Sequence, residues 1–253
     1  MYEETELFNA VNSLEKGLES LAVRKGVSVR AKEPQFVELL TDLMLLVLKR
    51  NEDINLTNIT EPEEFVKLHL LDSLACAGLA ETESAKKIID IGSGPGFPGL
   101  PLAALYPEKD FLLTDSLFKR IEFAKYAAEK LGLKNVRVLH SRAEKSGHDP
   151  ELREHFDLSL CRAVGKLPVV LEYCMPFVRV GGAGIFYKTI PAKGEIEDSL
   201  LARELLGCSE FVRTETYTDI LPGRGHALYI VEKLRPTPGK YSRREGIPSK
   251  VPL

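Results

Sequence analysis

The sequence predicts an α/β fold in which a mostly parallel sheet carries helices on both faces. From residue 86 onward, short apolar runs alternate with helical patterns, which is typical of a parallel sheet. A glycine-rich turn joins the first apolar run to the helix after it, as in α/β proteins that bind a ligand at that turn. Residues 1–80 look helical throughout. We therefore expect a helical cap at 1–80, a ligand-binding core at 81–235 and a basic tail at 236–253.

The cap is predicted to contain three helices. Apolar residues recur at helical spacing from Leu7 to Leu21, and a second apolar pattern runs from Pro34 to Arg50. Thr60-Glu61-Pro62-Glu63 has the form of a capping box and opens a third helix. The second helix is too apolar to lie alone on a surface, so it must pack against the core.

His69 and Asp72 lie three residues apart in the third helix. At that spacing they share one helix face, where they can form a hydrogen-bonded pair near a site. From the residues alone, a structural pair is the more economical interpretation.

The glycine-rich turn reads DIGSGPGFPG from Asp90 to Gly99. Its spacing fits a dinucleotide fingerprint counted from Gly94, and also an acidic-x-Gly-x-Gly-x-Gly pattern counted from Asp90. Pro95 and Pro98 carry no N–H group to offer a diphosphate, and the Asp90 carboxylate would repel one. The second pattern, typical of S-adenosylmethionine-binding loops, is therefore favoured. Asp90 attracts a cationic cofactor, and the glycines let that cofactor lie against the backbone. A strand-turn-helix that binds nothing stays as the plain alternative.

The remaining core strands each deliver a polar residue to one edge of the sheet. Phe111–Asp115 ends in a carboxylate placed to bind a ribose. Val136–Leu139 leads to a loop next to the expected adenine position, Phe156–Cys161 leads to Arg162, and Ala183–Tyr187 leads to Lys188. We also expect a Ser116-capped helix ending at Gly132, helices at 167–179 and 195–206, and a hairpin formed by 211–217 and 226–233.

Composition restricts the function. The net charge of −3 excludes a protein that coats nucleic acid by bulk charge. Four cysteines lie far apart without a CxxC pair, so neither a disulfide framework nor a metal cluster is expected, and the compartment is expected to be reducing. No signal peptide or membrane-spanning run is recognised. The tail holds four cations against Glu245, which is typical of a solvated end.

These motifs together resemble the glucose-inhibited division protein B family, the bacterial 16S ribosomal RNA guanine-N7 methyltransferases called RsmG. The resemblance covers nearly the whole chain, and few other families place two prolines inside the glycine loop. Phe118 and Ser242 depart from it, standing where glycine and proline are more common. The motifs that carry it are Asn55-Leu56-Thr57, the run from His69 to Leu74, the loop 90–99, the run from Asp115 to Arg120, and the tail with Tyr241, Arg243, Gly246, Pro248 and Lys250.

The resemblance implies a class I methyltransferase fold, with a seven-stranded sheet whose last strand is antiparallel, and S-adenosylmethionine as the methyl donor. By position it assigns the donor to residues of the loop and of the following strand ends. These are Asp90, Gly92, Gly94, Gly96, Phe97, Asp115, Ala143, Glu144 and Arg162.

Guanine N7 carries a lone pair at neutral pH, so its methylation needs alignment and no general base. The strand end Cys161-Arg162-Ala163 also lacks the Asp/Asn-Pro-Pro-aromatic motif of exocyclic-amine methyltransferases. We expect Arg162 and Lys188 to orient the base or its phosphate as the catalytic residues. Cys161 is interpreted as strand packing in preference to a covalent nucleophile.

RNA contacts are expected from cations near the sheet edge and in the tail. Lys119 and Arg120 lie in a helix's first turn, where they oppose the helix dipole and indicate a nearby anion. The full set is Lys119, Arg120, Arg224, Lys240, Arg243, Arg244 and Lys250. The expected partner is small-subunit ribosomal RNA in an assembled or partly assembled subunit, bound by a monomer in the cytoplasm. An NAD-dependent oxidoreductase and a non-catalytic RNA- or ribosome-binding module stay open as alternatives.

Overall fold

A computed structural model describes residues 2–25, 27, 29–189, 194–210, 212–217, 221 and 225–253. A seven-stranded sheet forms the centre of the molecule in the order β3-β2-β1-β4-β5-β7-β6. Strands β1 to β5 pair in parallel, and β7 is antiparallel to both β5 and β6. The strands are β1 Lys87–Ile91, β2 Asp110–Asp115, β3 Val136–His140, β4 Phe156–Arg162, β5 Val178–Thr189, β6 Arg213–Thr216 and β7 His226–Glu232. The seven-stranded α/β fold and its antiparallel β7 are confirmed.

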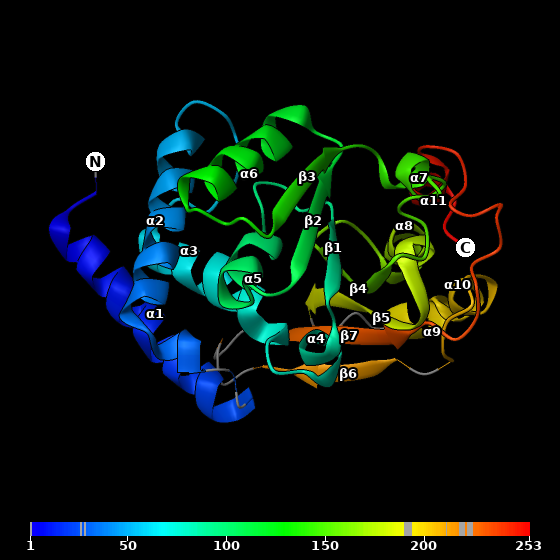
Figure 1. The fold of residues 1–253 in the computed structure, drawn as a ribbon, viewed down its shortest axis with the longest axis horizontal. Helices are drawn as coiled ribbons and strands as arrows, with labels where there is room; N and C mark the ends of the chain where they lie inside the picture. The colour runs from blue at the N-terminus through cyan, green and yellow to red at the C-terminus, as the bar shows by residue number, and fades with distance from the viewer. Residues whose placement is uncertain are drawn as a thin grey trace.

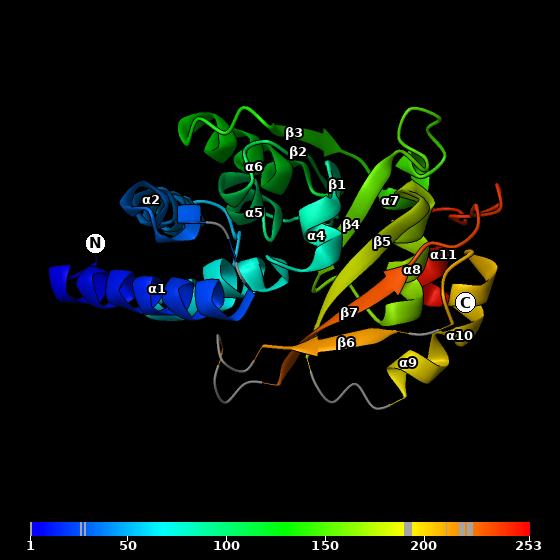
Figure 2. The same cartoon turned by 60° about the horizontal axis from the view of Figure 1, so that its bottom comes forward.

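Helices cover both faces of this sheet. Figures 1 and 2 show the N-terminal helices with α5 and α6 on one side, and α7, α8, α10 and α11 on the other. The α-helices are α1 Glu4–Lys25, α2 Pro34–Asn51, α3 Pro62–Phe65, α4 Ala80–Ser84, α5 Gly99–Leu105, α6 Phe118–Lys130, α7 Ala143–Ser146, α8 Leu167–Cys174, α9 Glu195–Asp198, α10 Leu200–Leu205 and α11 Ile247–Lys250. None of these helices, in the part of the chain that the structure describes, is long and apolar enough to span a bilayer.

Side chains alternate between two apolar clusters along each central strand. In β1, Ile88 faces the cluster formed with α1, α2, α5 and α6, whereas Ile89 faces the one formed with α8. Successive side chains of a strand point to opposite faces of the sheet. Because Ile88 and Ile89 are consecutive and both apolar, β1 is buried on both faces. The sheet is therefore a middle layer with apolar side chains buried on both of its faces.

The third cap helix is shorter and less regular than the sequence predicts. Regular α-helix ends at Phe65, after which come a π-helical turn (η2, Val66–Leu71) and a 3₁₀ turn (η3, Leu74–Cys76). The predicted capping box is wrong, because Glu61 is the N-cap residue and donates or accepts no capping side-chain bond. Single π-helical turns inside helices are frequent at functional sites, and this one carries His69.

Several other expected boundaries differ. Ser116 does not cap α6; the Asp115 carboxylate instead accepts the N–H of Leu117 at 2.7 Å. The helix predicted at 167–179 ends at Cys174, and a 3₁₀ turn (η4, Met175–Phe177) leads into β5. A further 3₁₀ turn, η1, spans Val29–Lys32 in the cap. The expected 211–217/226–233 hairpin is confirmed by the antiparallel pairing of β6 with β7.

Candidate active site

The glycine loop turns the chain from β1 into α5 through three left-handed residues. Gly92, Gly94 and Gly96 have φ values of +72°, +56° and +111°, which side chains disfavour. At Gly92 a Cβ atom would also lie 2.6 Å from Val164 Cγ2. The glycines therefore permit both the loop's shape and its close packing against the segment after β4.

The backbone N–H groups of this loop are already bonded within the protein. Pro95 and Pro98 have none, and each of the others in 92–99 donates to an internal acceptor. Gly92 and Ser93 donate to Thr114 O, Gly94 to Asp115 Oδ2, Gly96 and Phe97 to Ser93 O, and Gly99 to Asp90 Oδ2. A diphosphate bound at such a loop needs N–H groups that point at it, so the loop does not fit one.

Asp90 lies beneath the loop and is fully buried. Its Oδ2 accepts the Gly99 N–H at 2.8 Å, and its Oδ1 has no hydrogen-bond partner among the described residues. Burial raises the pKa of this carboxyl to about 7, although the Gly99 hydrogen bond and the Arg162 charge act in the opposite direction. Asp90 was expected to contact the donor, but it does not line the cavity above the loop; its buried charge acts on that cavity from below.

A cavity of about 320 Å³ opens above the loop, and we call it the loop cavity. Gly92, Gly94, Phe97 and Asp115 line it as expected, whereas Gly96 does not. The residues that complete its wall are Leu56, His69, Ser93, Pro95, Ser116, Leu117, Arg120, Arg162, Ala163 and Val164.

Asp115 is held in a fixed orientation at the end of β2. Its two oxygens accept N–H groups from Gly94 at 2.9 Å and from Leu117 at 2.7 Å. Each carboxylate oxygen can accept a second hydrogen bond, and Asp115 lines the loop cavity. This geometry suits the hydroxyl groups of a ribose and disfavours an anion.

A second cavity of about 340 Å³, which we call the strand-end cavity, lies beside the loop cavity. The two share His69, Arg162 and Ala163. The other residues of its wall are Ile59, Leu68, Asp72, Tyr187, Lys188, Thr189, Tyr217 and His226. Its wall is thus built from the π-helical segment and from the ends of β4, β5, β6 and β7.

Arg162 stands between the two cavities at the end of β4. Its guanidinium donates to Asp72 Oδ2 at 2.8 Å, to Leu68 O at 3.0 Å and to His69 Nδ1 at 3.1 Å. It also lies 5.6 Å from the centre of the Phe97 ring. These contacts clamp the β4 end to the cap and aim one cation at both cavities.

Asp72 collects three donors from distant parts of the chain. Its Oδ2 accepts from Arg162, and its Oδ1 accepts from Tyr217 Oη at 2.7 Å and His226 Nδ1 at 3.0 Å. Burial by itself raises the pKa of Asp72, but the His226 hydrogen bond and the Arg162 charge, with Tyr217, outweigh it and lower that pKa. Asp72 is therefore a carboxylate whose charge is already compensated.

His69 is a neutral ring stacked on the glycine loop. Its plane lies 18° from that of Phe97, with centroids 4.9 Å apart. Burial and the Arg162 charge lower its pKa to about 3. Because Arg162 donates to Nδ1, the ring proton is on Nε2 and is donated to Thr57 Oγ1 at 2.7 Å. The expected His69–Asp72 pair is bridged by Arg162 instead of bonding directly.

Lys188 lies at the strand-end cavity but is engaged elsewhere. Its Nζ donates to Glu195 Oε1 at 2.5 Å and to Gly165 O at 2.7 Å, and both charged side chains are nearly buried. Glu195 also accepts the N–H of Leu167, the first residue of α8. Lys188 therefore holds the β4–α8 connection, and its expected catalytic role stays a prediction.

Two residues that were expected to bind the methyl donor are not part of the wall of the loop cavity. Neither Ala143 nor Glu144 lines it. Glu144 is buried and its carboxylate accepts the N–H of Gly246 at 2.9 Å. Its side chain thus anchors the tail to α7, and adenine contact by this pair stays a prediction.

The expected RNA-binding cations fall into different environments. Lys119 is exposed and Arg120 lines the loop cavity. Lys240, Arg244 and Lys250 are exposed in the tail, and Arg224 is outside the described residues. Arg243 does not fit this role, since it forms an ion pair at 2.6 Å with Glu172, a residue with 0% exposure.

Sequence reasoning did not single out Thr57, Tyr217 and His226 as site residues. For His226 a signal was present, because it opens the antiparallel strand β7. The first residue of an antiparallel strand lies at the edge where the parallel strands end. Cys161 is buried, and its neighbour Cys174 and burial raise its thiol pKa well above the ordinary value, which supports its interpretation as strand packing.

Comparison with solved structures supports the fold. The S-adenosylmethionine-dependent methyltransferase SibL, in its apo form, aligns with a TM-score of 0.55 at 14% identity, covering 87% of this chain and 74% of its own. NSun6 from Pyrococcus horikoshii with SFG aligns at 0.51 and 15% identity, covering 66% and 52%. Likenesses at this identity establish the fold. A family model described as a methyltransferase, together with a loop cavity that disfavours diphosphate, places the chain in the class of S-adenosylmethionine-dependent methyltransferases.

Comparison of sequences identifies the family within that class. The family model of rRNA small subunit methyltransferase G (GidB) matches residues 37–212, and the chain belongs to this family. The ribosomal RNA small subunit methyltransferase G of Alkaliphilus metalliredigens is 42% identical over 208 residues, covering 82% of this chain and 87% of its own. The protein of the same name from Clostridium perfringens strain 13 is 43% identical over 211 residues, with coverages of 82% and 87%.

Proposed function

We infer that this protein transfers a methyl group from S-adenosylmethionine to N7 of a guanine in 16S ribosomal RNA. Family membership supports the donor and the RNA substrate. The observation that carries the chemistry is that the loop cavity and the strand-end cavity meet at Arg162, His69 and Ala163. The loop cavity suits the methyl donor and the adjoining strand-end cavity suits the methyl acceptor. Methyl transfer requires these two molecules to be held in contact.

The loop cavity fits S-adenosylmethionine, which supplies a methyl group on a cationic sulfur. Asp115 has acceptor capacity for ribose hydroxyl groups, and the glycines leave room for the ligand beside the backbone. The orphaned Asp90 Oδ1 adds a buried partial or full negative charge beneath the loop. A cation relieves that unfavourable group, whereas an anion would worsen it.

The strand-end cavity is proposed to receive the guanine. Among the described residues that line it, Asp72 has a lowered pKa and bonds three donors, and His69 has a pKa of about 3. Both are weak bases, so neither of these two residues is suited to removing a proton from an exocyclic amine. Guanine N7 carries a lone pair and needs none removed, which favours it as the methyl acceptor.

Arg162 is proposed as the catalytic residue that orients the acceptor. Its guanidinium faces both cavities, and Asp72 with Tyr217 and His226 holds it there. A fixed donor near guanine O6 restrains the base without taking part in bond making. Lys188 contributes by holding Gly165 and Glu195 in place.

We further propose that the substrate is an assembled or partly assembled small subunit, that the enzyme acts as a monomer, and that it works in the bacterial cytoplasm. The description of the family, an rRNA small subunit methyltransferase, supports the RNA partner in this proposal. The oxidoreductase alternative is disfavoured by the bonded loop N–H groups, and the non-catalytic alternative is separated by the transfer assay below.

The test is transfer of a labelled methyl group to small subunits that lack the modification, followed by mapping of N7-methylguanine in the 16S RNA. Wild type should label one guanine. Arg162→Ala should lower transfer at least about 100-fold, since a group aligned in the transition state is worth a few kcal/mol. Absence of any wild-type transfer would leave only the binding role.

Controls separate loss of chemistry from loss of folding. Arg162→Ala leaves the buried Asp72 carboxylate without its cation, which can destabilise the fold. Arg162→Lys keeps a cation there, and the two variants are compared by thermal melting and by S-adenosylhomocysteine binding. Arg179→Ala removes an exposed ion pair with Asp157 and should keep full activity. Full transfer by a folded Arg162→Ala protein would refute the role of Arg162.

A further inference from the structure

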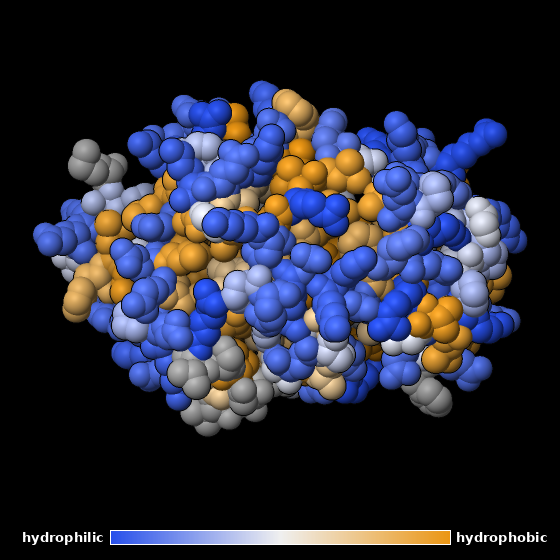
Figure 3. Space-filling view, in the orientation of Figure 1, coloured by the Kyte–Doolittle hydropathy of each residue, from blue (hydrophilic) through white to orange (hydrophobic). Residues whose placement is uncertain are grey.

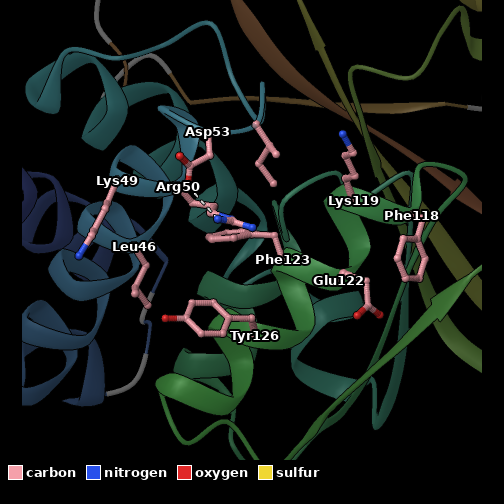
Figure 4. Close-up of a pocket in the computed structure, with 10 residues that line it drawn as sticks. Leu46, Lys49, Arg50, Asp53, Phe118, Lys119, Glu122, Phe123 and Tyr126 are labelled. Carbon is pink, nitrogen blue, oxygen red and sulfur yellow. Dashed lines mark hydrogen bonds and ion pairs between the residues drawn. The ribbon is translucent and has the colours of Figure 1, made fainter.

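A large groove separates α2 from α6 outside the two cavities of the active site. Its volume is about 660 Å³, roughly twice that of either cavity. In Figure 4, Leu46, Lys49 and Arg50 come from the α2 side, and Phe118, Glu122, Phe123 and Tyr126 come from α6. We call it the α2–α6 groove; its wall is completed by Asp53, Ile54 and Lys119. In Figure 3, apolar side chains gather at the surface where these two helices adjoin.

Exposed aromatic rings lie along this groove. Phe118 is 57% exposed and Tyr126 is 45% exposed, although both are large and apolar. They are eight residues apart on α6, about two turns along the helix. In Figure 4 the Tyr126 ring points toward α2, whereas Phe118 lies on the other side of the helix, where its ring packs edge-on against His140 with centroids 5.4 Å apart. Flat rings held open to solvent on a rigid helix are suited to stacking with unpaired bases.

Cations are distributed along the same groove. Lys49 and Arg50 extend from α2 and Lys119 from the first turn of α6, so that Figure 4 shows them well apart along its length. Lys130 lies 5.7 Å from the centre of the Tyr126 ring. Of the two carboxylates in the wall, Asp53 is bonded to Arg50 at 2.8 Å. The other is Glu122, so the wall holds three cations against two carboxylates, a slight positive excess on a chain whose net charge is −3.

The groove begins where the loop cavity ends. Within the first residues of α6 and the turn before it, Ser116, Leu117 and Arg120 line the loop cavity, whereas Phe118 and Lys119 line the groove. The groove therefore lies on the donor side of the active site, and an RNA chain whose target base enters the strand-end cavity would reach it across the mouth of the loop cavity.

We propose that the α2–α6 groove binds a single-stranded segment of the substrate RNA that flanks the target guanine, through base stacking on Phe118 and Tyr126 and phosphate contacts to Lys49 and Lys119. This rests on the proposed function and adds a docking site outside the active site. Single-stranded RNA is favoured over a peptide because spaced cations alternate with exposed rings, the combination that tracks a nucleic-acid backbone.

The experiment compares Phe118→Ala, Tyr126→Ala and the pair Lys49→Ala/Lys119→Ala with wild type. Each aromatic variant should raise KM for small subunits about 3- to 10-fold, given partly exposed stacking, while kcat and S-adenosylhomocysteine affinity stay unchanged. The dissociation constant for protein-free 16S RNA should rise by a similar factor. The lysine pair should reduce the slope of log affinity against log salt by about 1.4, or 0.7 per lost phosphate contact.

Matched controls come from α1. Phe8→Ala removes a ring that is 66% exposed, and Lys16→Ala removes an exposed lysine; both should leave KM and RNA affinity unchanged. Binding to protein-free RNA is read without catalysis, so this test stays decisive even if the wild type transfers no methyl group, the outcome that would refute the proposed function.

Three outcomes would overturn the proposal. Unchanged KM and RNA affinity in all groove variants would show that the groove binds no RNA. A raised KM for subunits with unchanged affinity for protein-free RNA would assign the groove to a ribosomal protein. A fall in kcat alone would assign these side chains to the shape of the active site.

Discussion

Asp90 combines complete burial with a loop made for a cationic ligand. Its carboxyl has one hydrogen bond, from Gly99, and one oxygen without a partner among the described residues. Burial is the largest influence on its pKa, which rises from 3.8 to about 7. A charged carboxylate there is costly to the folded protein alone and favourable to a bound cation.

Asp90 should make the folded protein less stable as pH rises. Its folded-state pKa exceeds its unfolded value, so the folded state binds the proton more tightly, and the free energy of unfolding falls between about pH 4 and pH 7. At about 1.36 kcal/mol per pKa unit, the free energy of unfolding falls by up to roughly 4 kcal/mol over this range. Urea unfolding at pH 5 and pH 8 should show Asp90→Asn gaining stability relative to wild type at the higher pH. An equal difference at both values would contradict the shifted pKa.

Arg162 and Lys188 show how similar sequence positions lead to different roles. Both lie at the carboxyl end of a parallel strand, at the same edge of the sheet. Arg162 meets Asp72 and His69 and faces both cavities, whereas Lys188 meets Glu195. The chain that packs against each strand end decides which cation is available to a substrate.

At the scale of elements, the π-helical segment η2 explains the arrangement of His69 and Asp72. In a regular helix, residues three apart lie on one face and can bond each other. Here the widened turn leaves space between them that the Arg162 guanidinium fills. The cap therefore supplies part of the active-site wall.

The C-terminal segment is a packed element, although its composition is typical of a solvated tail. Tyr241 and Ser242 are buried, and Arg153 donates to the carbonyl groups of Gly147, Tyr241 and Thr237. Arg243 neutralises the buried Glu172 carboxylate against α8. One cation of the tail is thus structural.

Arg243→Ala should destabilise the protein by about 3 kcal/mol, because it leaves the buried Glu172 charge unpaired. Arg244→Ala, at an exposed neighbouring position, should change stability by less than about 0.5 kcal/mol. Chemical denaturation measures both. Should the two variants be equally stable while Arg243→Ala alone weakens RNA binding, Arg243 would return to the RNA-binding set.

At the scale of the whole molecule, the cap and the sheet share one apolar cluster. Leu14 and Leu40 of the cap belong to the same cluster as Ile88 of β1 and Leu100 of α5, and α2 packs against α5. Figure 2 shows α1 and α2 at the opposite end of the molecule from α11. The division at residue 80 stays a prediction, and this shared cluster argues against independent folding of the cap.

Unfolding should therefore be a single cooperative transition that includes the cap. Hydrogen exchange at increasing denaturant should expose the amides of α2 and β1 in the same step, because neither has an apolar cluster of its own. Earlier exposure of α2 by a separate transition would instead establish the cap as an independent unit.

The sequence alone determined the sheet, its glycine loop and the polar residues at the strand ends. Apolar runs, glycine positions and turn residues are local signals, and Asp115, Arg162 and Lys188 were found through them. Only the tertiary structure decided which of these side chains face a cavity. The partners of Arg162 and Asp72 lie some 90 to 154 residues away, and Glu172 and Arg243 are 71 residues apart. Such encounters depend on the packing of distant segments, which no local pattern encodes.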